Sequence, residues 1–325
     1  NLDSNRGAVR FIRSVLRTTL IFELAGAILS FFVFVQDYPP LRSMGISLFH
    51  SVAAFNNSGF DILGNFQNLI PYQNSVMLNL TTCGLVFFGG IGFLVIREMV
   101  QHKLKWRKYS MHAKVVLSVS GALILAGTLL LKATEDISWL GALFHSVSAR
   151  TAGFSTYPLK TFSNAGLLAL TALMFIGASP ASTGGGIKTT TLAALLLLVH
   201  SVVRGRDRIT VFRKEISQDT GHRAVALTFI ATSFVLAVTC ALSILERRHG
   251  VSLTNLVFET VSAVSTTGLS AAGTGVLRRS SQILLMLLMY LGRVGPLTLA
   301  TALIRREKDG ARNRVCFPEE KIMIG

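Results

Sequence analysis

Apolar runs long enough to cross a membrane recur along the chain, and they restrict its possible folds more than any other feature. A helix needs ~20 apolar residues to cross a hydrocarbon core of ~30 Å. Half of the 325 residues are hydrophobic and only 15% are charged. The sequence therefore predicts an all-α membrane protein embedded in a lipid bilayer, with apolar blocks at 14–36, 74–97, 113–131, 163–203, 222–246 and 281–304.

Three shorter apolar stretches lie between these blocks, at 46–55, 140–149 and 252–264. Helices of this length are too short to cross a bilayer. Irregular backbone at membrane depth is tolerated only where it lines a water-filled cavity or is buried in protein. We therefore expect each stretch to be a re-entrant helix, which enters the membrane and returns to the same side.

The basic residues indicate how the blocks are oriented. The net charge is +16, and 22 of the 32 Lys and Arg residues fall at 1–17, 97–114, 204–223 and 305–321. These clusters form no aromatic-interleaved basic face, so no nucleic-acid partner is expected. By the positive-inside rule, the N-terminal segment, the basic loops and the C-terminus are expected to be cytoplasmic.

The block at 163–203 is too long for one straight crossing, because about 40 helical residues extend ~60 Å. Two crossings would place the basic cluster at 204–223 outside, against the rule that the other clusters obey. We therefore expect one broken span, interrupted by the glycine-containing residues 177–188.

A short pattern occurs three times, at 49–60, 144–154 and 258–269. Each copy begins with Phe and ends in small polar residues followed by a glycine, and one apolar block precedes it while another follows. The unit is therefore span, pore helix, filter strand and span, an arrangement that resembles potassium channels. Three such units are expected at 1–112, 113–221 and 222–304, followed by a cytosolic tail at 305–325.

The glycines indicate the chemistry of these units. Glycine permits a left-handed backbone that turns successive carbonyls toward one axis, and rings of carbonyls can replace the hydration shell of potassium. One glycine alone can equally cap its helix, but three copies in the same position favour a cation filter. The candidate filter residues, which would hold potassium at their backbone carbonyls, are Asn57, Ser58, Gly59, Thr151, Ala152, Gly153, Thr266, Thr267 and Gly268.

The three loops and the stretches at 184–188, 290–296 and 318–325 together resemble the Trk/Ktr/HKT superfamily of potassium transporters, and the KtrB type of membrane subunit most of all. The resemblance implies potassium uptake in the bacterial inner membrane rather than enzyme activity, with potassium as substrate and no covalently bound cofactor. It also implies a homodimer that sits on a cytosolic nucleotide-binding ring of the KtrA/TrkA type.

That superfamily builds its pore from four span-pore-span repeats, whereas this sequence contains three. The three units match the second, third and fourth repeats, so the first repeat is expected to be missing on the N-terminal side. Three filter strands would leave one quadrant of the pore open, with carbonyls that neither lipid nor a cation satisfies. We therefore expect the pore to need a fourth element.

The resemblance also implies that the interruption in the third repeat is an intramembrane gate below the filter. Three glycines suit that role, because each costs a helix ~1 kcal/mol relative to alanine: Gly184, Gly185 and Gly186. Charges in apolar surroundings usually face a cavity or a partner. We interpret Arg293 as a residue that positions the plug and Lys188 as a loop charge, although Lys188 can also snorkel to the cytoplasmic interface.

Four other polar residues have specific expectations. Glu259 is expected to hold its filter loop through backbone N–H groups rather than to bind a cation. His50 and His145 are expected to be structural, because no other His or Cys recurs at metal-ligand spacing. Arg150 is expected to pair with a carboxylate outside the pore.

The sequence leaves two other transport functions open. A sodium-permeable or sodium-coupled cation transporter of the same family fits the same loops, since selectivity depends on carbonyl geometry. A secondary transporter with discontinuous helices also has glycine-rich breaks, although it predicts inverted repeats. A nucleotide-dependent enzyme is excluded, because Ile187 separates the glycines from Lys188 where a phosphate-binding loop requires Gly-Lys.

Overall fold

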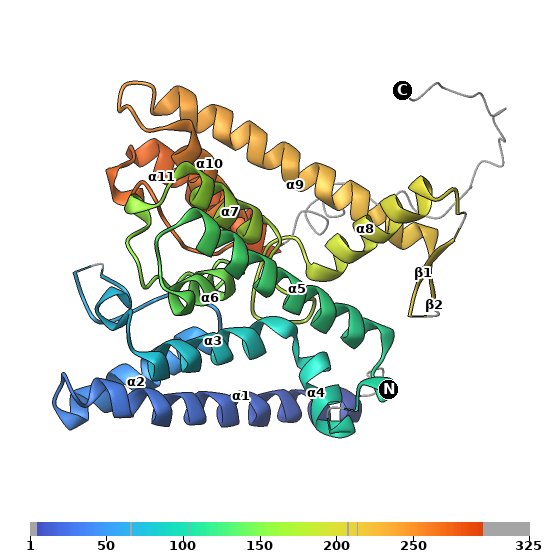
Figure 1. Cartoon of the computed structure of the whole chain (residues 1–325), viewed down its shortest axis with the longest axis horizontal. Helices are drawn as coiled ribbons and strands as arrows, with labels where there is room; N and C mark the ends of the chain where they lie inside the picture. The colour runs from blue at the N-terminus through green and yellow to red at the C-terminus, as the bar shows by residue number, and fades with distance from the viewer. Residues whose placement is uncertain (1–4, 66, 104, 207, 213, 295–325) are drawn as a thin grey trace.

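The computed structural model describes residues 5–65, 67–103, 105–206, 208–212 and 214–294. Within these residues the chain is almost wholly helical (Figure 1). The expected cytosolic tail, the motif at 318–325 and the last part of the sixth apolar block lie outside the described residues.

Three long helices carry the fold: α1 (Asn5–Phe34), α5 (Met111–Thr134) and α9 (Gln218–Leu245). Among the described residues, these are the helices long and apolar enough to cross a membrane unaided. Their apolar side chains largely face outward, since Leu20 of α1 and Leu236 of α9 are 56% and 62% exposed. Such exposure along a continuous apolar helix is typical of a surface that faces lipid.

The same succession of elements follows each long helix. A short helix comes first: α2 (Pro40–Phe55), α6 (Trp139–Ser148) and α10 (Leu253–Val264). A loop with a 3₁₀ turn comes next: η1 (Ile70–Tyr72), η3 (Leu159–Thr161) and η4 (Thr274–Val276). A further helix then completes the unit: α3 (Val76–Ile91), α7 (Asn164–Phe175) and α11 (Arg279–Val294).

The second apolar block, at 74–97, is not the single straight span that its sequence suggests. α3 ends at Ile91, and α4 (Phe93–His102) leaves it at an angle of 102°. Gly92 forms the corner with a φ of 91°, which disfavours any side chain. A Cβ at Gly92 would also collide with the carbonyl oxygen of Pro180. The corner therefore requires glycine both for its conformation and for this contact.

The fourth apolar block, at 163–203, is interrupted where the sequence predicts a break. α7 ends at Phe175, and α8 (Thr189–Val203) begins after a non-helical segment. A parallel bridge between Ile176 and Ile187 brings the two ends of that segment together. After α8 the chain forms a small antiparallel ribbon that the all-α expectation does not include: β1 (Ile209–Val211) and β2 (Lys214–Ile216).

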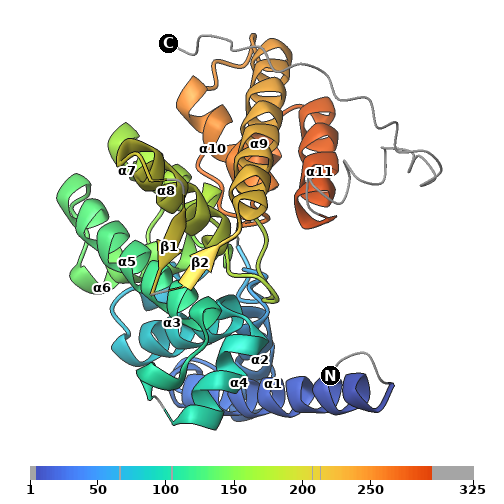
Figure 2. The same cartoon turned by 90° about the vertical axis from the view of Figure 1, so that its right-hand side faces the viewer.

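The three units share their hydrophobic cores. One cluster joins Phe34 and Phe55 of the first unit to Phe144 of the second. Another joins Leu170 of the second unit to Phe258 of the third. Figure 1 shows α1 and α9 at opposite edges, with α6 and α7 between them, and Figure 2 gives the same assembly from the side. Packing across the unit boundaries holds the loops after the short helices close together.

Two of the units each have a carboxylate that links two of their helices. Glu135 follows α5 and accepts hydrogen bonds from the N–H and the hydroxyl of Ser163, at 3.0 and 2.6 Å. Glu246 follows α9 and accepts from the N–H of Arg278 at 2.8 Å and the hydroxyl of Ser281 at 2.5 Å. Carboxylates are favourable at helix N-termini. Each one therefore ties the end of a long helix to the start of the helix that completes its unit.

Candidate functional site

The three predicted filter loops share one backbone conformation. In each loop, the glycine and the residue two positions before it are left-handed, while the residue between them has a negative φ. Threonine rarely adopts a positive φ because it is β-branched. Finding it at the same place in two loops indicates a conformation that the surrounding structure imposes. The φ values are 51° and 70° for Asn57 and Gly59, 73° and 83° for Thr151 and Gly153, and 54° and 87° for Thr266 and Gly268.

Each loop is bonded in the same way to the helix that precedes it. The residue before the glycine donates its N–H to a carbonyl in the last turn of α2, α6 or α10, at 2.9 Å in every case. These bonds fold the loop back over the C-terminus of its helix. The donor and acceptor pairs are Ser58 to Ala53, Ala152 to Ser148, and Thr267 to Ser262.

The glycines allow the loops to meet backbone to backbone. A Cβ added at Gly59 would lie 2.6 Å from the carbonyl oxygen of Ala152 and 2.9 Å from the Cα of Gly153. A Cβ added at Gly153 would overlap the carbonyl oxygen of Thr267, whereas one at Gly268 would meet no atom within 4 Å. The second loop is thus in contact with the first and the third, and both contacts exclude a side chain.

Side chains behind the loops hold them in place. Glu259 in α10 accepts hydrogen bonds from the N–H groups of Ala271 and Ala272 at 3.1 and 3.2 Å, just after the third loop. It also accepts from the hydroxyls of Ser270 and Thr274. This is the anchoring role expected for Glu259. Two serines anchor the other side of their loops, Ser148 to the carbonyl of Phe154 and Ser262 to that of Leu269.

The chemistry offered by the three loops is that of backbone dipoles. None of the nine candidate residues is acidic, basic or strongly nucleophilic. The loops lie at the C-termini of three helices, where the helix dipole places partial negative charge. Carbonyl oxygens and helix C-termini together favour a cation without binding it irreversibly.

The glycine-rich segment, residues 177–188, packs directly against two of these loops. A Cβ added at Gly184 would collide with the hydroxyl of Thr151, and one at Gly185 would collide with that of Thr266. The hydroxyl of Thr183 donates to the carbonyl of Gly89 at 3.1 Å. The segment thus connects the second and third loops to the end of α3.

Two cationic side chains hold carbonyls of this segment. Lys188 Nζ donates to the carbonyl of Gly184 at 2.7 Å, and Arg293 Nη1 donates to that of Thr183 at 2.6 Å. Both side chains line a cavity of about 510 Å³ bounded by Gly184–Gly186, α9 and α11. Lys188 is half-buried, and its side chain is hydrogen-bonded to its own segment. This position differs from the alternative expectation, in which Lys188 snorkels outward to the cytoplasmic interface.

A second cavity, of about 640 Å³, lies on the other side of the loops. Gly153 and Gly268 line it, together with Asp61, Tyr157 and Lys160 from the outer loops. The three loops therefore lie between two cavities, and the glycine-rich segment borders one of them.

The other sequence expectations are met in part. His50 is buried and bonded to the hydroxyl of Thr82 at 2.9 Å, and His145 packs among aromatic rings, so both are structural as expected. No group of three or more metal-ligating side chains occurs among the described residues. The expectation for Arg150 is wrong, because its guanidinium is buried and bonded to the carbonyl and hydroxyl of Ser120 rather than to a carboxylate.

Sequence reasoning missed the part that α3 contributes. The N–H of Ser179 donates to the carbonyl of Gly90 at 2.9 Å, and that of Phe93 donates to the carbonyl of Ala181 at 3.1 Å. The sequence does contain a sign of this glycine-rich corner, Gly89-Gly-Ile-Gly92, which resembles the glycine triplet at 184–186. The residues around it are apolar enough, however, to suggest an uninterrupted span.

Comparison with known proteins gives consistent matches. Residues 114–311 match the TrkH family, described as cation transport protein. The chain is 32% identical to the potassium/sodium uptake protein NtpJ of Enterococcus hirae, over 100% of this chain and 74% of that protein. It is 31% identical to the Ktr system potassium uptake protein B of Vibrio alginolyticus, over 97% of this chain and 70% of that protein.

A solved structure shares the fold. The potassium transporter TrkH of Vibrio parahaemolyticus superposes with a TM-score of 0.74 at 19% sequence identity, covering 92% of this chain and 65% of that one. At this identity the likeness concerns the fold alone. With the family match and the identity to the Ktr and NtpJ proteins, it leads to one conclusion: the chain belongs to the TrkH/Ktr family of membrane cation transport proteins.

Proposed function

We propose that this chain forms the ion pathway of a potassium uptake system, with potassium as the transported substrate. The observation that carries the proposal is the identical alternation of positive and negative φ in three loops that meet backbone to backbone. A single helix cap explains one such loop, but not three in contact. Their carbonyls replace the hydration shell of a potassium ion as it passes.

Sodium permeation is the second candidate, and a specific observation favours it. The relative from Enterococcus hirae is named a potassium/sodium uptake protein, whereas the one from Vibrio alginolyticus is named a potassium uptake protein. Selectivity depends on the field and spacing of the carbonyls. Competition of sodium with rubidium for uptake separates the two functions.

The glycine-rich segment is proposed as the gate. Its residues 184–186 abut Thr151 and Thr266, and the cavity of about 510 Å³ lies beside it. Lys188 and Arg293 hold its carbonyls in the present position. Opening the pathway requires the segment to leave the loops, which breaks these hydrogen bonds.

The assembly is proposed from the repeated architecture. The units at 1–112, 113–221 and 222–304 act as three sectors around one pathway, and a fourth sector completes it. The protein acts as a homodimer in the bacterial inner membrane, with a cytosolic nucleotide-binding ring as its regulator. Its basic clusters, including those at 97–114 and 204–223, lie on the cytoplasmic side, because this orientation satisfies the positive-inside rule for each of them.

Rubidium flux into proteoliposomes tests the function and the gate together. With the fourth sector present to complete the pathway, the protein should take up rubidium down its gradient, and deleting 180–189 should raise the flux because the obstruction is removed. A variant with the conservative change Leu236→Ile on the exposed face of α9 is the matched control. Uptake that requires a second coupled ion gradient would support a secondary transporter instead. Lower flux in a correctly assembled deletion variant would give the segment a structural role.

A further inference from the structure

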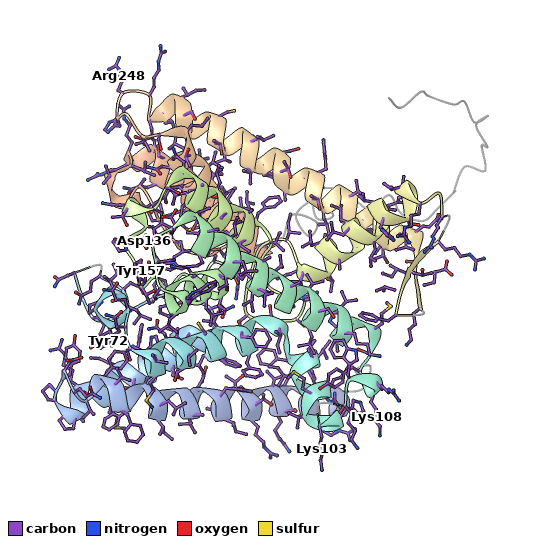
Figure 3. The ribbon with its side chains drawn as sticks, in the orientation of Figure 1. Tyr72, Lys103, Lys108, Asp136, Tyr157 and Arg248 are labelled. Carbon is purple, nitrogen blue, oxygen red and sulfur yellow. The ribbon has the colours of Figure 1, made fainter. Side chains whose placement is uncertain are left out.

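The elements α4 and η2 (Trp106–Lys108) form an arm that turns away from α3, with Val95 and Ile96 of α4 packed against α5. α4 leaves α3 at 102°, so it runs across the direction of the spans rather than along it. Figure 3 shows Lys103 and Lys108 pointing away from the body of the molecule. If α3 crosses the membrane, this angle lays the arm along the membrane surface.

The arm carries a mixed basic and apolar surface. Its one acidic side chain, Glu98, is occupied by the N–H and hydroxyl of Ser110, at 2.9 and 2.7 Å. Val100 and Trp106 are exposed at 72% and 44%. The basic residues are all exposed, and none forms an ion pair with an acidic residue in the described part of the chain: Arg97, Lys103, Lys105, Arg107 and Lys108.

The base of the arm is bonded to the proposed gate. The N–H of Phe93, the first residue of α4, donates to the carbonyl of Ala181 at 3.1 Å. Gly92 lies against the carbonyl of Pro180, and the N–H of Ser179 donates to Gly90 at 2.9 Å. A change in the angle of α4 therefore acts on the glycine-rich segment without any intervening element.

The far end of the arm is braced by the ribbon. The ring of Trp106 lies 5.9 Å from that of Tyr109 and 6.4 Å from that of Phe212, at the turn between β1 and β2. Tyr109 is buried at 6% exposure. The arm is thus held at both ends, which leaves its basic face as the part free to make a new contact.

We propose that this arm binds anionic phospholipid headgroups at the cytoplasmic membrane surface, and that the bound lipid holds the glycine-rich segment in its obstructing position. An uncompensated basic cluster beside an apolar run attracts the negative leaflet. Exposed Trp and aliphatic residues on the same arm suit the interfacial region of a membrane, where headgroups meet acyl chains. A soluble acidic protein would attract the basic residues but would offer no apolar layer to the Trp and aliphatic side chains. The gating part of the proposal rests on the proposed cation pathway and on its proposed orientation.

Tryptophan fluorescence tests lipid binding independently of transport. The chain has two tryptophans, Trp106 and Trp139, so the Trp139→Phe variant reports on the arm alone. Brominated phosphatidylglycerol should quench it at a several-fold lower mole fraction than brominated phosphatidylcholine. Equal quenching by the two lipids would overturn the proposal. Suppression of the difference by millimolar inorganic phosphate would show an anion site instead of a lipid contact, and would also overturn it.

Matched charge variants test the specificity of the contact. Replacing Lys103, Lys105 and Lys108 by Gln should abolish the preference of the reporter for phosphatidylglycerol. Replacing Arg204, Arg206 and Lys214 by Gln removes the same charge from the ribbon region, and the preference should persist. Loss of preference in both variants would mean that any basic loop attracts this lipid, against the proposal.

Rubidium flux at increasing phosphatidylglycerol tests the coupling to the gate. Flux through the unaltered protein should fall several-fold as the anionic fraction rises, whereas flux through the variant at 103, 105 and 108 should stay constant and high. Lipid-independent flux in the unaltered protein would refute the coupling. If no preparation conducts rubidium while Trp106 still prefers the anionic lipid, the proposed pathway fails and the lipid contact stands.

Discussion

Gly153→Ala and Gly268→Ala form a pair that separates backbone strain from steric collision in the proposed filter loops. Both glycines are left-handed, with φ of 83° and 87°, so alanine costs each loop about 1–2 kcal/mol. Only at Gly153 would the new Cβ strike another loop, at the carbonyl oxygen of Thr267. Restoring an ordinary carbon–oxygen contact requires the two loops to separate by about 1 Å.

That displacement should dominate the functional effect. We expect Gly153→Ala to lower rubidium flux by at least a factor of about ten, which corresponds to about 1.4 kcal/mol. The variant should also have a weaker preference for rubidium over sodium. Gly268→Ala should lower thermal stability similarly while retaining most of the preference.

Flux and sodium competition should be measured in proteoliposomes at matched protein content, after size-exclusion chromatography has shown normal assembly. Equal loss of preference in the two variants would refute the reasoning, because strain alone would then explain both. Unchanged flux and competition in both variants would remove the loops from the pathway.

Three further predictions follow from individual contacts. Glu259→Ala should destabilise the protein by about 1–3 kcal/mol for each of the two backbone N–H groups it leaves unpaired, and Glu259→Gln by less, as measured by thermal unfolding in detergent. Burial alone would raise the pKa of Glu246, but hydrogen bonds from a serine hydroxyl and a backbone N–H lower it below 4.5. Its stabilisation is therefore complete above pH 4.5 and lost as the pH falls through the lowered pKa, so Glu246→Gln should lower the melting temperature at pH 7 and by progressively less as the pH falls below 4.5. Arg293→Gln should raise rubidium flux by releasing the carbonyl of Thr183, whereas Arg279→Gln on the same helix should not; equal flux in the two would contradict the gate assignment.

Elements set by composition and repetition can be predicted from the sequence. The long helices follow from runs of ~20 apolar residues, and the three short helices follow from a pattern that recurs between those runs. The break before α8 is predictable because three successive glycines weaken a helix. Glu259 is predictable as an anchor because a buried carboxylate needs hydrogen-bond donors nearby.

Features that depend on contacts between residues distant in the sequence cannot be predicted from composition or repetition. Gly92 lies in a run apolar enough for a straight span, and only its contact with Pro180 explains the corner. Thr151 and Thr266 disfavour the left-handed backbone that their loops adopt, so their propensity points to the wrong conformation. Arg150 finds its partner on α5, at Ser120, a pairing for which the local sequence contains no signal.

The most direct test of the cation pathway is to locate a heavy potassium substitute in the protein. A structure determined with thallium or rubidium should show anomalous density beside the carbonyls of 57–59, 151–153 and 266–268, between the two cavities. The density should weaken when potassium is added in excess. Ordered cation density elsewhere in the membrane region, with none beside these loops, would contradict the assignment of the filter.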